Sequence, residues 1–108
     1  MGRVLLRPAA RRDLVQHFAY IGENAGLNAA HRFISLARRT FGDLALSPGV
    51  GVPGKVRKLP NLRMWRIRDF EKYLIFYHSV EDNIHIERVI HAARDYNRVL
   101  DSDRANLP

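Results

Sequence analysis

The chain has 108 residues, a net charge of +7 and no cysteine. This length fits one domain with one hydrophobic core, and the lack of cysteine excludes disulfides, zinc–thiolate sites and thiol nucleophiles. The charge excess lies entirely in residues 1–60, which hold 10 basic and 3 acidic side chains, whereas residues 61–108 hold 8 of each. A basic half of this kind attracts nucleic acid or an acidic protein, and a merely solubilising surface is the alternative.

No apolar run is long enough for a signal peptide or a membrane span, since Val4–Leu6 is bounded by Arg3 and Arg7. The sequence therefore predicts a cytoplasmic protein that does not contact membranes. We expect residues 1–100 to form a single domain and residues 101–108 to be a flexible tail.

The first half of the chain predicts a short strand followed by two helices. Residues 3–7 are strand-like, and Pro8 ends the strand and opens a helix, because proline suits the first helical turn. Gly26 provides a stop for this helix, and Asn28 is the expected N-cap of the next. Each helix has one apolar stripe, made of Leu14, Phe18 and Ile21 in the first and of Ala30, Phe33, Ala37, Phe41 and Leu44 in the second. The short link predicts an antiparallel helix hairpin.

Residues 48–60, PGVGVPGKVRKLP, form a connection rich in glycine and proline. Lys55, Arg57 and Lys58 are clustered within it. Loops of this length are often functional, and the segment could also lie as a partly extended strap against a sheet.

The second half of the chain predicts three strands. The first covers residues 62–70, and a tight turn is expected at residues 70–73. Residues 73–77 are apolar on both faces, as in a central strand, and residues 81–83 predict a second turn before a strand at residues 83–90. The alternation of apolar and polar residues fails at residues 88–90, which suggests a bulge in this strand. Residues 96–100 suggest a helical turn. The predicted fold is therefore α+β, in the order β-α-α-β-β-β, with a helix hairpin packed on a small antiparallel sheet.

Phosphodiester cleavage needs proton donors and acceptors and a cation that stabilises the transition state. Side chains able to supply these functions are Arg66, Glu71, His91, Arg94 and Tyr96. The set is thin, because His91, Arg94 and Asp95 can equally close the last strand as structural residues. We therefore assign no catalytic residue and keep these five as the candidates if the protein is an enzyme.

No group of side chains has the spacing of a metal site, and no phosphate-binding glycine loop precedes a helix, so we expect no metal and no cofactor. The basic side chains are collectively a stronger signal, and they predict a surface that binds an acidic partner or target. They are Arg11, Arg12, Arg32, Arg38, Arg39, Lys55, Arg57 and Lys58. The poor interleaving of aromatic residues among them disfavours sequence-specific nucleic-acid recognition, and an acidic peptide fits them at least as well.

Four segments resemble the ParE branch of the RelE/ParE toxin superfamily: LRPAARRDLVQHFAYI, LALSPGVG, LRMWRIRDFEKYLIFYH and IERVIHAARD. The resemblance covers residues 3–98, and the last two segments are its most specific parts. It implies a bacterial toxin of a type II toxin–antitoxin system, with the β-α-α-β-β-β fold, that is wrapped and neutralised by the C-terminal segment of a cognate antitoxin.

In this superfamily, ParE-type members poison DNA gyrase, and RelE-type members cut mRNA in the ribosome. Trp65, Phe70 and residues 73–77 resemble the ParE type. We therefore expect a non-enzymatic gyrase inhibitor. The alternatives are a ribosome-dependent mRNA endonuclease and a relative that only binds its antitoxin.

Overall fold

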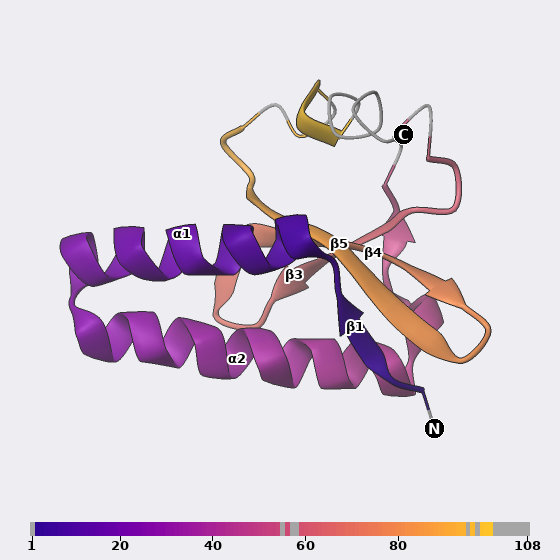
Figure 1. Ribbon diagram of the computed structural model, residues 1–108, viewed down its shortest axis with the longest axis horizontal. Helices are drawn as coiled ribbons and strands as arrows, with labels where there is room; N and C mark the ends of the chain where they lie inside the picture. Colours follow the sequence, from indigo (N-terminus) through magenta and orange to yellow (C-terminus); the bar gives the residue numbers. More distant parts are fainter. Residues whose placement is uncertain (1, 55, 57–58, 95, 97, 101–108) are drawn as a thin grey trace.

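The computed structural model describes residues 2–54, 56, 59–94, 96 and 98–100. Two antiparallel helices lie against one face of a five-stranded sheet (Figure 1), which confirms the predicted α+β class and helix-hairpin architecture. The elements are β1 (Val4–Leu6), α1 (Pro8–Ala25), α2 (Leu27–Leu46), the 3₁₀ turn η1 (Pro48–Val50), β2 (Val52–Pro53), β3 (Arg63–Ile67), β4 (Phe70–Val80) and β5 (Asn83–His91).

The strand order is β1-β5-β4-β3-β2, and the sheet is mixed. β1 runs parallel to β5, whereas the other three pairs are antiparallel. The expectation of an antiparallel sheet was wrong at β1. The helix hairpin and strands β2 to β4 all lie between β1 and β5 in the chain, so no tight turn forces these two strands to be antiparallel. β2 is a fifth strand, which forms within the predicted strap.

Gly26 alone connects the two helices. It is both the C-cap of α1 and the residue before α2, and its φ of 96° is a conformation that side-chain-bearing residues rarely adopt. The expected N-cap at Asn28 was wrong, because α2 already begins at Leu27 and Asn28 lies inside its first turn.

The core has two parts, one on each face of the sheet. The first lies under the helices and includes Phe33, Phe41, Tyr73, Ile75 and Tyr77. The second lies on the opposite face and consists of Val56, Leu62, Phe76, Ile90 and Leu100. Residues 73–77 are apolar on both faces because alternate side chains enter different clusters.

The turn between β3 and β4 is formed by Arg68 and Asp69, not by residues 70–73. Asp69 has a φ of 64°, and a short polar side chain tolerates this left-handed conformation. Phe70 and Tyr73 instead contribute to the helix-side cluster. Packing of these two side chains favours a strand over a turn, and β4 begins at Phe70.

A bulge in β5 lies next to a buried ion pair between β5 and α1. Phe76 lies opposite Arg88 and Tyr77 lies opposite Ile86, so Glu87 is the extra residue, just before the predicted range 88–90. The Arg88 guanidinium donates to both oxygens of Asp13, at 2.7 Å from Nε and 2.9 Å from the terminal nitrogen. The Val89 amide also donates to Asp13, at 2.9 Å. These three bonds fix α1 to the sheet.

His17 forms a second polar contact between α1 and β5, and it makes stability dependent on pH. Its Nε2 donates to the Val89 carbonyl at 2.7 Å. Burial is the main effect and lowers the pKa of His17, whereas the Val89 hydrogen bond and Asp13 raise it and His91 and Arg94 lower it.

Because the pKa of His17 lies below its unfolded value of 6.5, the unfolded chain binds the proton more readily. The stability contributed by His17 is therefore complete above the unfolded pKa and is lost as the pH falls through the folded value. We expect the Tm to drop between about pH 7.5 and about pH 5.5, and to drop less in His17→Asn. Equal pH dependence of the two proteins would exclude His17 as the cause.

Within the part of the chain that the structure describes, neither helix is long and apolar enough to cross a membrane.

Candidate functional site

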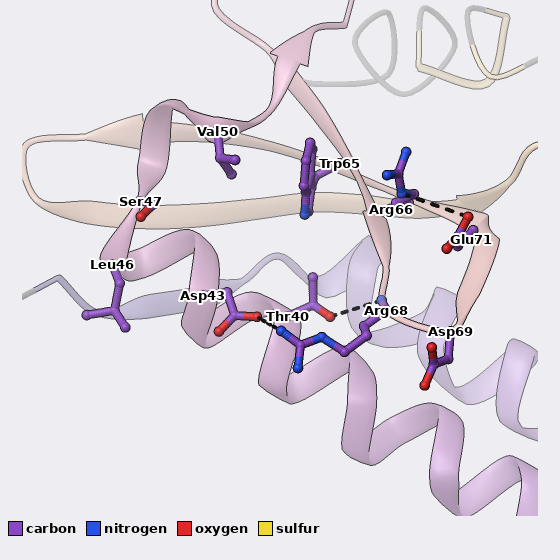
Figure 2. Close-up of a pocket in the computed structure, with 10 residues that line it drawn as sticks. All are labelled: Thr40, Asp43, Leu46, Ser47, Val50, Trp65, Arg66, Arg68, Asp69 and Glu71. Atoms are coloured by element: carbon purple, nitrogen blue, oxygen red, sulfur yellow. Dashed lines mark hydrogen bonds and ion pairs between the residues drawn. The ribbon is translucent and has the colours of Figure 1, made fainter.

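A groove of about 480 Å³ opens between the C-terminal half of α2, η1 and the β3–β4 hairpin (Figure 2). Leu46, Val50 and Trp65 provide its apolar surface. The other lining residues are Thr40, Asp43, Ser47, Arg66, Arg68, Asp69 and Glu71. The groove therefore combines apolar side chains with a charged border. Protein–protein interfaces have a similar arrangement of an apolar core and a polar rim.

The groove is apolar because of how α2 ends. The apolar stripe of α2 finishes at Leu44, so Leu46 lies off the stripe and is 69% exposed. Pro48 then starts η1 and places Val50, which is 43% exposed, on the same side. Trp65 is half-buried and packs against the helix-side core. Two exposed aliphatic side chains beside a tryptophan favour binding of an apolar group.

Tyr77 holds the η1 wall of the groove in place. Its hydroxyl donates to the Pro48 carbonyl at 2.8 Å and accepts from the Gly51 amide at 2.9 Å. Arg63 adds a donor to the Gly51 carbonyl at 2.7 Å. Burial raises the pKa of Tyr77, against smaller lowering effects of Gly51 and Arg63, so the phenol stays protonated and can donate. The wall is therefore fixed to the sheet from within.

Two ion pairs border the groove. Arg68 lies 3.2 Å from Asp43, and Arg66 lies 4.0 Å from Glu71, with all four side chains about half exposed. The Arg66 guanidinium also lies 5.4 Å from the centre of the Trp65 ring. Exposed pairs of this kind contribute about 0–1 kcal/mol each, so they shape the border more than they stabilise the fold.

The outer edge of β3 is open next to the groove. β2 pairs only with Arg63 and Met64, and the described residues place no further strand beside Trp65, Arg66 and Ile67. Unpaired backbone groups at a sheet edge can bind an extended peptide by adding a strand. The groove thus lies next to backbone groups that are free to recognise such a peptide.

Of the five candidates for catalysis, the structure pairs Arg66 with Glu71 but places His91 and Tyr96 on opposite faces of the sheet. His91 packs on Tyr73 on the helix side, with ring centres 5.0 Å apart, whereas Tyr96 packs on Phe76 on the opposite face, at 5.2 Å. Arg66 and Glu71 belong to the β3–β4 hairpin and border the groove. His91 also accepts the Ala93 amide at 3.1 Å, and its carbonyl accepts the Arg94 amide at 3.0 Å. These bonds close the last strand, which is the structural role that the sequence allowed.

The predicted basic side chains lie on both helices. Arg11 and Arg12 occupy the start of α1, Arg38 and Arg39 lie on α2, and all four are exposed. Arg32 is exposed too, but it is paired with Asp69 at 2.8 Å. Lys55, Arg57 and Lys58 lie outside the described residues, as do Asp95 and the expected tail at residues 101–108.

The sequence did not reveal the groove. Leu46 carried the available signal, because an apolar residue off the buried stripe at a helix end is expected to be exposed. The charged border of the groove could not be predicted from the sequence, because only the packing of α2 against the hairpin brings Asp43 and Arg68 together. Among the residues that the structure describes, no three His, Asp or Glu side chains are arranged to hold a metal ion.

Comparisons with known proteins agree with this fold. The family model of the ParE toxin of the type II toxin–antitoxin system parDE matches residues 4–96. A solved structure titled "Chromosomal ParDE TA system from P. aeruginosa" matches with a TM-score of 0.72 and 17% sequence identity, over 84% of this chain and 96% of that chain. No curated protein matches the sequence.

The fold is that of a small α+β domain with a helix hairpin on one face of its sheet. The match over residues 4–96 shows that the chain belongs to the ParE toxin family of type II toxin–antitoxin systems.

Proposed function

We propose that this ParE-type toxin inhibits DNA gyrase and is neutralised by a cognate antitoxin. The observation that carries the proposal is the family match over residues 4–96. The placement of His91 and Tyr96 on opposite faces of the sheet supports a non-enzymatic mechanism, because proton transfer requires groups within hydrogen-bonding reach of one substrate.

Purified toxin is expected to block the supercoiling of relaxed plasmid by gyrase and to leave a cell-free translation reaction active. Prior mixing with the antitoxin should restore supercoiling. Full supercoiling at saturating toxin would refute the proposal. Loss of translation with cleaved mRNA would instead establish the endonuclease alternative, and a protein without effect in either assay would be one that only binds its antitoxin.

We propose the groove as the binding site of an antitoxin segment. Leu46, Val50 and Trp65 offer an apolar anchor site, and the open edge of β3 offers backbone groups to an extended chain. Burial of one large apolar side chain there would contribute about 1.5–3 kcal/mol. The charge excess of the first half of the chain would attract an acidic partner and mainly speed the encounter.

Leu46→Asp is expected to weaken antitoxin binding at least about tenfold, because a carboxylate would enter the apolar part of the groove. Val15→Asp is the matched control, since Val15 is also 69% exposed and helical but does not line the groove. The dissociation constants can be measured by isothermal titration calorimetry. Equal affinity of Leu46→Asp and wild type would place the antitoxin elsewhere.

The electrostatic contribution has a separate test. The association rate of toxin and antitoxin should fall as salt rises from about 0.05 M to about 0.5 M, because ions screen the attraction between exposed charges. Stopped-flow fluorescence of Trp65, the single tryptophan, provides the readout. A rate that does not change with salt would rule out electrostatic steering.

A further inference from the structure

The end of the β4–β5 hairpin carries two histidines in register, away from the groove. His78 lies directly opposite His85 in the antiparallel pair. Their rings are stacked, with centres 5.1 Å apart and planes 20° from parallel. Cross-strand neighbours of this kind project from the same face of the sheet, so both imidazoles are presented to the same volume of solvent.

Glu87 sets the chemical state of one of these rings. Its Oε1 lies 3.3 Å from Nδ1 of His78, and its Oε2 lies 3.6 Å from Nε of Arg7. In a neutral imidazole, the nitrogen that faces a carboxylate carries the proton, so Nε2 of His78 keeps its lone pair. Metal-binding histidines commonly have this arrangement, in which a carboxylate accepts from the nitrogen that does not bind the metal.

The bulge explains why Glu87 is available for this role. As the extra residue of β5, it has no partner in the ladder with β4. Its carboxylate lies between Arg7, at the end of β1, and His78, on β4. His78 is therefore held in a fixed orientation, with the carboxylate on the ring nitrogen that does not bind the metal.

We infer that His78 and His85 form a two-imidazole site for a divalent transition-metal ion such as Cu²⁺ or Ni²⁺, with Glu87 as the residue that positions His78. Imidazole nitrogen suits these ions, and Cu²⁺ binds most tightly among the first-row divalent metals. Water would complete the coordination, in keeping with the lack of a third protein ligand among the described groups. An ion bound between the two rings would tie β4 to β5.

Binding is tested by calorimetric titration of the untagged protein with CuCl₂ or NiCl₂ alone in a buffer that does not bind metals. Wild type should bind one ion, and the affinity should fall at least about tenfold in His78→Asn and in His85→Asn. The matched control is His31→Asn, because His31 is exposed on α2 and makes an edge-to-face contact with Phe18, far from the hairpin in sequence. Its affinity should equal that of wild type.

Two further readouts identify the role of each residue. Electron paramagnetic resonance of the Cu²⁺ protein should show two imidazole nitrogens in wild type and one in His85→Asn. Glu87→Gln should keep two nitrogens but bind more weakly, as expected of a positioning residue. Wild type without saturable binding, or His85→Asn with unchanged affinity and spectrum, would overturn the inference. Circular dichroism checks that each variant is folded.

Discussion

Asp13→Ala is expected to lower the free energy of unfolding by about 3–5 kcal/mol, because it removes the buried carboxylate that accepts two hydrogen bonds from the Arg88 guanidinium. The side chains of Asp13 and Arg88 are only 6% and 12% exposed, and the guanidinium makes two hydrogen bonds to the carboxylate. The substitution also removes the acceptor of the buried Val89 amide. Chemical denaturation monitored by circular dichroism measures the change.

Asp43→Ala is the matched control for Asp13→Ala. Asp43 also pairs with an arginine from the sheet side, Arg68, but both side chains are about half exposed. Asp43→Ala should lower the free energy of unfolding by at most about 1 kcal/mol. The double variant Asp13→Leu/Arg88→Met should recover most of the stability that Asp13→Ala loses, since replacing both charges leaves none unpaired. Equal effects of the two aspartate substitutions would show that burial does not strengthen the Asp13–Arg88 contribution.

Gly51→Ala is expected to destabilise the protein by about 1–3 kcal/mol, because a methyl group has no room there. A Cβ atom at position 51 would clash with the Tyr77 hydroxyl and lie 2.8 Å from its ring, and Tyr77 is completely buried. The ring could not move aside without disturbing the core, so the η1 wall of the groove would shift. Thermal denaturation compares this variant with Gly49→Ala, whose Cβ would meet no atom within 4 Å.

Tyr77→Phe tests the same contact from the other side. It keeps the ring but removes the partner of the Gly51 amide and the donor to the Pro48 carbonyl. A buried polar group left without a partner costs about 1–3 kcal/mol. If Gly51→Ala and Gly49→Ala were equally stable, the close approach of Gly51 to Tyr77 would not contribute to the fold.

The helices could be predicted in detail because their signals are local. Pro8 begins α1 where the sequence indicates, Gly26 ends it, and the stripe from Ala30 to Leu44 is buried as predicted. The same local reasoning failed where burial competed with turn propensity. The segment 70–73 was expected to turn, but Phe70 and Tyr73 are needed in the core, and Asp69 takes the turn instead.

Local sequence thus determined the class of fold, the helix hairpin and the central strand at residues 73–77, because helix limits and hydrophobic periodicity depend on neighbouring residues. The resemblance of the strand segments to ParE toxins was also readable from the sequence alone. Only the tertiary structure decided the parallel pairing of β1, the Asp13–Arg88 ion pair and the groove beside Trp65. Each of these joins residues far apart in the chain, and such contacts are set by how whole elements pack rather than by any short stretch of residues.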